Sequence, residues 1–311
     1  MYFENIIGQN LPKRYMTNSI NNNKISHAYM FEGGEGIGKK EFAKEFASIL
    51  MKSSNIVNNP DYIEIKPEGS SIKISQIRKL QSDIVIKPHS EYKIYVILNS
   101  DKMTLEAQNA ILKTLEEPPK YAIIILIANN KEALLDTIKS RCEIIKFTPI
   151  SEIDLKKYLI KQDIDEQRAS IAVSFSRGSI DKALELSKSS DFSIMREDIQ
   201  QYIDIILEKD LFDILNTSNI IDKYKGEIHT VLDVMINYFR DVMILKEKIY
   251  KDTIINGDRI TFVQNINKKI SYSQVTKIID IIEDIKKKLR SNCNFNISMQ
   301  VMALNIYEVV K

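Results

Sequence analysis

The sequence predicts a fold in two parts, a parallel α/β sheet in the first half of the chain and helices alone in the second half. Between residues 27 and 147, short apolar runs of strand length alternate with amphipathic stretches of helical length. Several runs are rich in Ile and Val without period-2 alternation, as expected for strands buried on both faces of a parallel sheet. After Pro149 the strand-like runs stop and helical spacing takes over.

The elements follow in chain order. The predicted strands are His27–Phe31, Tyr62–Ile65, Lys93–Leu98, Ala122–Ala128 and Glu143–Phe147. Three short helices are predicted next, with Gly178 as a break before the last: Ser151–Gln162, Glu166–Arg177 and Ile180–Ser187. Further on, Tyr272–Arg290 carries one apolar stripe at spacings of three and four. Because 311 residues suit two or three domains, we expect an α/β domain at 1–149, a small helical lid at 150–190 and a helical domain at 191–311.

The composition is that of an ordinary globular protein. Lys+Arg 44 against Asp+Glu 42 leaves a net charge of +2, so any nucleic-acid contact must come from a local patch. The longest nearly unbroken apolar run, Ala122–Ala128, is far shorter than the ~20 residues of a membrane span. No export signal is visible, and Cys142 and Cys293 form neither a disulfide framework nor a metal-ligand pair. We expect a reduced cytoplasmic protein.

A glycine-rich loop follows the first predicted strand. It reads Gly-Gly-Glu-Gly-Ile-Gly-Lys-Lys and matches G-x-x-x-x-G-K. In such loops the glycines, here Gly33, Gly36 and Gly38, let backbone N–H groups reach phosphate, and the lysine, here Lys39, neutralises phosphate charge. The next position needs a hydroxyl for magnesium but holds Lys40. The pattern predicts a degenerate phosphate-binding loop; the alternative is a glycine-rich turn with a structural role only.

The third predicted strand lacks the acidic pair that would orient magnesium and activate water in a phosphoryl-transfer enzyme. It ends in Leu98 and Asn99 instead. Asp101 lies nearby, on the turn that should follow the strand. We interpret Asp101 as a loop or capping residue, and a displaced metal ligand is the alternative.

Several segments together resemble the bacterial clamp-loader family of AAA+ proteins. The most diagnostic is Asn109–Pro119, Asn-Ala-Ile-Leu-Lys-Thr-Leu-Glu-Glu-Pro-Pro, and Ser140-Arg141-Cys142 matches the SRC motif of the family. Supporting matches are Ser26–Phe31, Ile74–Arg78 and Asn294–Met299. The resemblance covers essentially the whole chain, most strongly up to residue 147. It implies an AAA+ module, a lid and an oligomerising collar.

Three departures from the motor subunits of that family fall on the hydrolytic site. Lys40 replaces the hydroxyl, Leu98 and Asn99 replace the acidic pair, and Asp181 stands where the motor subunits carry a lid arginine. Because phosphoryl transfer depends on positioning and charge, we expect no hydrolysis and no required cofactor, whereas nucleotide binding at the altered loop stays open. The zinc module of the family is also absent, since Met51–Asp61 contains no Cys or His, and we expect no metal site.

Arg141, in contrast, still matches the motif of the family. By resemblance it is an arginine finger, which would point into the ATP site of a neighbouring motor subunit and stabilise the charge of phosphoryl transfer there. The alternative is that Arg141 caps a strand start and forms a surface salt bridge. We interpret Cys142 as a small buried residue, because no histidine lies near it in sequence to activate a thiol.

The resemblance also implies partners. These are the motor (gamma/tau) and delta subunits, the sliding clamp and the backbone of primer–template DNA, with no membrane. Arg78, Lys102 and Thr104 are the candidates for DNA contacts, which would give position rather than sequence reading; otherwise Arg78 is an ordinary solvated charge. We expect a rigid, non-catalytic subunit that helps load the clamp onto primed DNA in replication. The alternative is an active motor subunit, with Lys39 binding nucleotide and Asp101 restoring metal binding.

Overall fold

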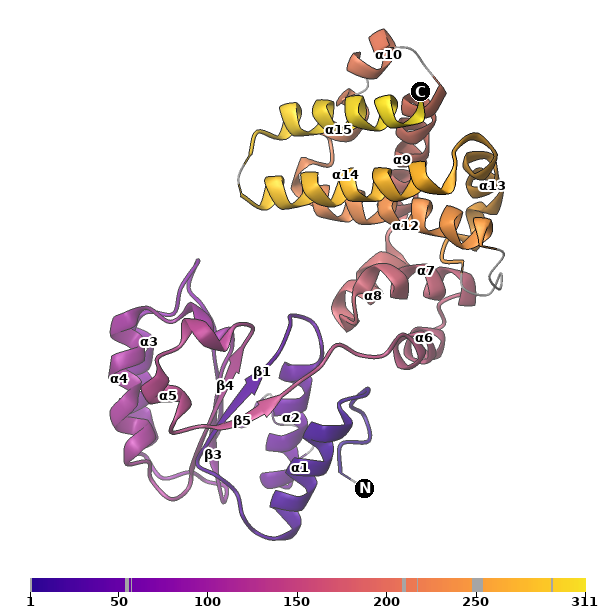
Figure 1. The fold of residues 1–311 in the computed structure, drawn as a ribbon. Helices are drawn as coiled ribbons and strands as arrows, with labels where there is room; N and C mark the ends of the chain where they lie inside the picture. The colour runs from indigo at the N-terminus through magenta and orange to yellow at the C-terminus, as the bar shows by residue number, and fades with distance from the viewer. Residues whose placement is uncertain are drawn as a thin grey trace. The chain divides into compact units, whose positions relative to one another are not determined.

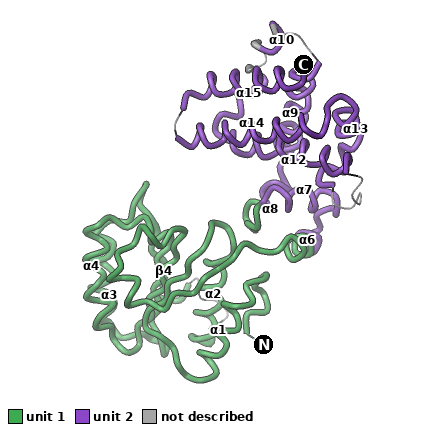
Figure 2. Tube along the Cα trace, in the orientation of Figure 1, with its two compact units in different colours: residues 1–158, 177–182 green, residues 159–176, 183–311 purple. Residues whose placement is uncertain are grey.

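The computed structural model describes residues 2–53, 56, 58–208, 211–216, 218–247, 254–291 and 293–311. The chain forms two compact units, coloured separately in Figure 2. The α/β unit comprises Met1–Tyr158 and Arg177–Lys182, and the helical unit comprises Leu159–Ser176 and Ala183–Lys311. The three-domain division at residues 149 and 190 stays a prediction.

Five parallel strands form the sheet of the α/β unit in the order β2-β3-β4-β1-β5. The strands are β1 (Ala28–Glu32), β2 (Tyr62–Ile65), β3 (Lys93–Ile97), β4 (Ala122–Ala128) and β5 (Glu143–Lys146). All five predicted strands are confirmed, with ends that differ by at most one residue. The central strands β3 and β4 are buried along their whole length, as their Ile- and Val-rich sequences predict.

Helices cover both faces of this sheet (Figure 1). One face packs against α1 (Asn10–Asn21) and α2 (Lys39–Leu50). The other packs against α3 (Ile74–Ile84), α4 (Leu105–Glu116) and α5 (Asp136–Lys139). Two 3₁₀ turns, η1 (Ser100–Lys102) and η2 (Lys131–Ala133), follow β3 and β4. The predicted α/β fold is therefore confirmed.

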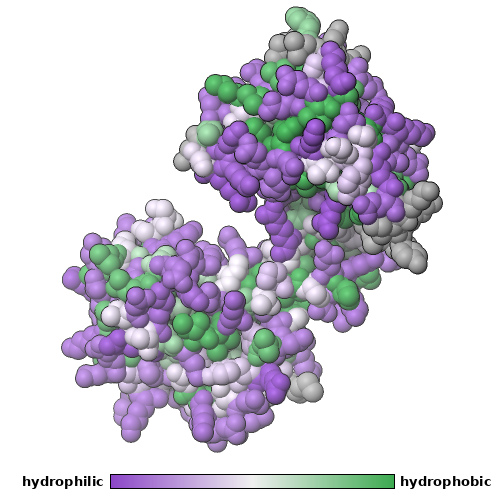
Figure 3. Space-filling view, viewed as in Figure 1, coloured by the Kyte–Doolittle hydropathy of each residue, from purple (hydrophilic) through white to green (hydrophobic). Residues whose placement is uncertain are grey.

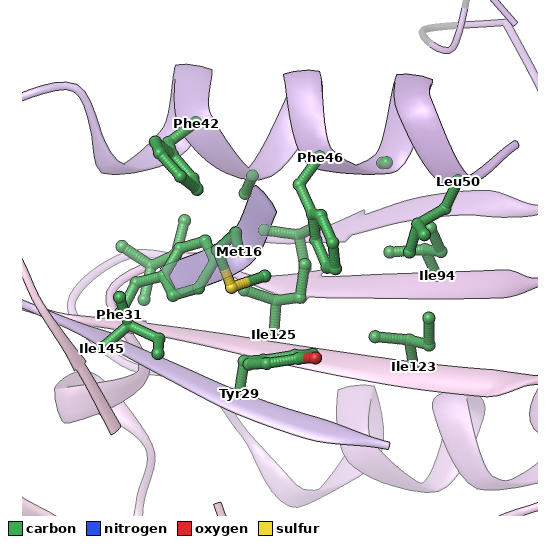
Figure 4. Packing of buried hydrophobic residues seen from close by; sticks show 14 of the residues in the cluster. Met16, Tyr29, Phe31, Phe42, Phe46, Leu50, Ile94, Ile123, Ile125 and Ile145 are labelled. Atoms are coloured by element: carbon green, nitrogen blue, oxygen red, sulfur yellow. The ribbon is translucent and has the colours of Figure 1, made fainter. Parts of the chain in front are cut away.

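The core under α2 is aromatic. Phe42 and Phe46 point from α2 onto the strands, where they meet Phe31 and Tyr29 (Figure 4). Phe31 and Phe42 pack edge to face with ring centroids 5.7 Å apart, a geometry that aromatic pairs favour. Both side chains are fully buried. This packing fixes the start of α2 and so the loop that precedes it.

The part of the chain after β5 is helical throughout the residues that the structure describes. The helices are α6 (Glu152–Lys161), α7 (Glu166–Ser176), α8 (Ile180–Lys188), α9 (Ser190–Glu208), α10 (Leu211–Asn216), α11 (Ser218–Asp222), α12 (Ile228–Lys246), α13 (Ile260–Lys269), α14 (Tyr272–Arg290) and α15 (Phe295–Val310), with 3₁₀ turns η3 (Lys225–Glu227) and η5 (Gly257–Arg259). The predicted helices are confirmed, and α14 has the predicted bounds. Its apolar stripe is buried from Val275 to Ile285, between α12 and α15.

Polar side chains cover most of each unit on the face seen in Figure 3. Some large apolar side chains are exposed among them, for example Phe212, and Leu11, which lines a surface pocket with Tyr15 and Ile144. Exposed apolar residues are normal on a folded surface. None of the described helices is long and apolar enough to cross a bilayer.

Candidate functional site

The phosphate-binding loop predicted from the sequence lies between the carboxyl end of β1 and the start of α2, as expected. Gly36 and Gly38 have φ angles of 73° and 89°, in the left-handed region that favours glycine. The N–H of Gly33 donates to the carbonyl of Ala128, 3.2 Å away, and ties the loop to β4. The loop therefore lies at the sheet edge where open α/β folds bind ligands.

Lys39 turns back onto its own loop. Its ammonium donates to the carbonyls of Gly33, at 2.5 Å, and Gly34, and to Oδ1 of Asn129 at 2.9 Å. Only 5% of the residue is exposed. Burial lowers the pKa of Lys39 to about 8, although the carboxylate of Asp101 acts in the opposite direction. The amine that would neutralise phosphate is thus already bound to three oxygens of the protein.

Lys40, at the position of the missing hydroxyl, is held away from the loop by an ion pair. Its ammonium lies 3.3 Å from Oε2 of Glu64 on β2. Burial acts to raise the pKa of Glu64, but Lys40, with Tyr62 and Lys44, outweighs burial and lowers it. Glu64 is therefore the charge partner of this lysine, and the position offers no oxygen ligand for magnesium.

The end of β3 also differs from a hydrolytic site. Leu98 is buried, and Asn99 adopts a left-handed conformation with φ of 52°. Asp101 lies in η1, and its Oδ1 accepts a hydrogen bond from the backbone N of Asn129 at 3.0 Å. This contact fits the loop role that the sequence suggested for Asp101. The structure thus brings Lys39, Asn129 and Asp101 together around the loop.

Two of the residues that build this region were missed by the sequence analysis. Asn129 bridges Lys39 and Asp101, and its signal was its place directly after a fully buried strand. Gln9 is buried, and its amide donates to the carbonyls of Ile37 at 3.0 Å and Thr148 at 2.8 Å. The backbone N of Thr148 donates back to Gln9 Oε1 at 3.2 Å. Gln9 had no local sequence signal.

Arg141 follows α5 and precedes β5. Its Nη1 donates to the carbonyl of Thr137 at 2.8 Å, and its Nη2 forms an ion pair with Oε1 of Glu116 at 2.7 Å. The side chain keeps one third of its surface exposed. Burial raises the pKa of the neighbouring Cys142 thiol to about 12, which opposes thiolate chemistry. Arg141 is thus held in place by the end of α4 and by α5, yet reachable from outside.

Arg141 lies at the opposite edge of the sheet from the phosphate-binding loop. Glu143, the first residue of β5, pairs in register with Tyr29 of the parallel neighbour β1, and Arg141 lies in the turn that precedes β5. The loop begins at Gly33, four residues beyond Tyr29 and roughly 13 Å further along the strand at ~3.3 Å per residue. Arg141 therefore cannot reach the loop of its own chain.

The three DNA-contact candidates lie on α3, in the turn η1, and at the start of α4, which packs against α3. Arg78 is exposed on α3, Lys102 is exposed in η1, and Thr104 caps α4 by accepting a hydrogen bond from the N of Ala107. The starts of α3 and α4 are joined, because the N of Ile72 donates to Lys102 O and the N of Thr104 to Ile72 O. The structure therefore places Lys102 and Thr104 beside the first turn of the helix that carries Arg78.

In the described ranges, no three His, Cys, Asp or Glu side chains gather so that they could hold a metal ion. The Nε2 of His27 donates a hydrogen bond to the carbonyl of Leu115 at 3.1 Å, in keeping with a packing role.

The parallel sheet, the loop after β1 and the helical region that follows define an AAA+ type of P-loop fold. A solved structure with this fold is the DNA polymerase III gamma subunit-related protein of Thermotoga maritima. It shares 21% sequence identity and matches with a TM-score of 0.50 over 95% of this chain and 99% of its own. At that identity the likeness concerns the fold alone.

Sequence comparison gives the family. Residues 8–151 match the model described as "DNA polymerase III, delta subunit", and residues 191–306 match "DNA polymerase III, delta subunit, C terminal". The delta' subunit of Bacillus subtilis is 29% identical over 95% of both chains. The tau subunit of the same organism is 26% identical over 98% of this chain and 61% of its own. The chain belongs to the clamp-loader subunit family of DNA polymerase III.

Proposed function

We propose that this chain is a non-hydrolysing, delta'-type subunit of a DNA polymerase III clamp loader that supplies Arg141 to the ATP site of a neighbouring subunit. The observation that carries the proposal is the position of Arg141, which precedes the amino end of β5, whereas the loop of its own chain follows the carboxyl end of the neighbouring strand β1. A guanidinium that is partly exposed and far from its own loop can complete a phosphate site only in another chain.

The altered loop supports the non-hydrolysing part of this proposal. Lys40 is paired with Glu64, and Asp101 is bonded to the backbone of Asn129. Lys40 offers no hydroxyl, and Leu98 and Asn99 stand where an acidic pair would orient magnesium and activate water in phosphoryl transfer. We expect no intrinsic ATPase activity from the purified chain. Turnover at the rate of ordinary AAA+ motors, abolished by Lys39→Ala, would favour instead an active gamma/tau-type motor, the function suggested by the similarity to tau.

The proposed partners follow from this role. They are motor (gamma/tau) and delta subunits, the sliding clamp, and the backbone of primer–template DNA, in the cytoplasm. The helical unit would join the collar of the complex, and the α/β unit would present Arg141. Contacts to DNA would come from Arg78, Lys102 and Thr104, and would be to phosphates.

The decisive experiment is reconstitution of the loader with Arg141→Ala. The side chain is anchored only at the surface, so the variant should fold and assemble. Its complex should lose ATP hydrolysis at the one site that Arg141 completes, by on the order of 10³–10⁵ at that site, while the total rate falls less. Arg141→Lys should rescue poorly because an ammonium lacks the planar fork.

Arg168→Ala is the matched control, since Arg168 is an exposed arginine on α7. It should leave clamp-stimulated ATPase and clamp loading unchanged. Wild-type rates in the Arg141→Ala complex would remove the arginine finger from the proposal and leave a scaffold subunit.

A further inference from the structure

The phosphate-binding loop is covered by a short segment from the start of α8, Ser179–Asp181, called the covering segment below. The backbone N of Ile180 donates to the carbonyl of Gly36 at 2.7 Å. A Cβ built on Gly36 would lie 2.1 Å from Ser179 Oγ, and one on Gly38 would lie 3.4 Å from Ile180 Cδ1. The covering segment belongs to the same compact unit as the loop. The two segments are therefore in direct contact.

The surroundings of the loop oppose a bound triphosphate. The ammonium of Lys39 already donates to Gly33, Gly34 and Asn129. The carboxylate of Asp181 lies 3.3 Å from the position of a Cβ on Gly36, so it would face phosphate oxygens that carry the same sign of charge. The nucleotide that the fold family implies does not fit the residues present.

We propose that the covering segment closes the phosphate-binding loop, so that this chain binds no nucleotide and the loop instead anchors the start of α8. Ser179 adds to the anchor, because its Oγ accepts a hydrogen bond from the N of Lys182 at 3.3 Å and so begins the helix. This inference extends the proposed function from absence of hydrolysis to absence of binding. Gly36 then lacks a side chain because Ser179 packs closely against it, and not because phosphate must approach the backbone there.

The first test measures nucleotide binding by the full-length wild-type chain. Titration with ATP and with ADP, each with magnesium and with EDTA, should give no saturable binding up to about 1 mM. A dissociation constant in the micromolar range for either nucleotide overturns the proposal. This measurement needs no variant, so it holds even if a substitution in the loop impairs folding.

The second test follows hydrogen exchange of the Ile180 amide in two glycine variants. Gly36→Ala places a methyl group against Ser179 Oγ and should release the covering segment, so that the Ile180 amide exchanges roughly tenfold faster or more. Gly34→Ala is the matched control, because a Cβ there meets nothing within 4 Å. It should leave the exchange rate at the wild-type value. Equal rates in the two variants overturn the proposal.

A double variant separates the contact from backbone strain at Gly36. Ser179→Ala alone removes a helix-capping acceptor and should speed exchange at Ile180. In the Gly36→Ala chain, Ser179→Ala removes the oxygen that clashes with the new methyl group and should therefore slow exchange of the Ile180 amide. Backbone strain from the φ of 73° at position 36 would not be affected by this substitution. If Ser179→Ala does not slow exchange in the Gly36→Ala chain, the proposed contact between position 36 and Ser179 is wrong. Nucleotide binding without hydrolysis would refute this inference alone, whereas normal ATPase with Arg141→Ala would refute only the proposed function.

Discussion

Two adjacent lysines show how single residues decide the chemistry of the loop. Lys39 points inward and binds the oxygens of its own loop and Asn129, whereas Lys40 points to Glu64. Both positive charges are thereby satisfied within the protein. A phosphate group would have to compete with these contacts for Lys39, and magnesium would find no ligand at Lys40.

The low pKa of Lys39 makes the stability of the protein depend on pH. The pKa is about 8 in the folded chain against 10.5 for the free side chain. Between these values the unfolded chain binds the proton and the folded chain does not, so stability rises with pH. We expect the free energy of unfolding of wild type minus that of Lys39→Met to increase by about 1 kcal/mol per pH unit between about pH 8 and 10. Urea titrations at three pH values check this, and a flat or falling difference would contradict it.

The identities of the site residues could be predicted from the sequence, but their partners could not. Glycine spacing identified Lys39, and the Ser-Arg-Cys motif identified Arg141. Their partners Asn129 and Glu116 are distant in sequence and meet them only through the fold. Gln9 is the clearest case, since an amide close to the first helix carries no sign that it will bind Thr148.

At the scale of elements, the local pattern predicted strands and helices well. Strands such as Ala122–Ala128 are apolar at every position because both faces are covered, and this leaves a signal in the sequence itself. The strand order β2-β3-β4-β1-β5 has no such signal, because it depends on which strands pair across the sheet. That order places β5 directly beside β1, so Arg141 and the loop of its own chain are separated along the strands, at their opposite ends.

In the helical unit, a buried ion pair anchors η5, the 3₁₀ turn that precedes α13. Arg196 on α9 is 3% exposed and donates to both carboxylate oxygens of Asp258 at 2.8 Å. Arg196→Met should lower the free energy of unfolding by roughly 3–5 kcal/mol, because it leaves buried polar groups unpaired. Lys288→Met is the control: its pair with Asp284 is exposed on both sides and is worth about 1 kcal/mol or less. Urea unfolding measures both, and equal losses would contradict the argument.

The joined starts of α3 and α4 give a prediction about DNA. In the assembled loader, Arg78→Ala and Lys102→Ala should each weaken binding to primed DNA regardless of sequence, and each should reduce the slope of log affinity against log salt by about 1. Lys113→Ala is the control, since Lys113 is exposed in the last turn of the same helix α4. Binding titrations at several salt concentrations check this. An unchanged slope would mean that Arg78 and Lys102 are ordinary solvated charges that make no contact with DNA.

For the whole molecule, the two compact units suggest a division of labour. All five strands and both core clusters of the α/β unit lie between residues 3 and 147, so this core is complete without the helical unit. The helical unit has its own buried core, in which α12 and α15 both pack on α14. The proposed roles follow this division, with Arg141 in the first unit and assembly in the second.

This division predicts opposite behaviour for two fragments. Residues 151–311, which keep α6 whole and contain every residue of the helical unit, should fold and co-purify with the motor subunits. Residues 1–150 should keep the sheet but not assemble. A loader built with the 151–311 fragment should hydrolyse ATP as the Arg141→Ala complex does, because both lack the same guanidinium. Circular dichroism establishes that each fragment is folded before pull-down and ATPase assays. A folded 151–311 fragment that fails to assemble, or a 1–150 fragment that assembles as well as the full chain, would exclude the collar role.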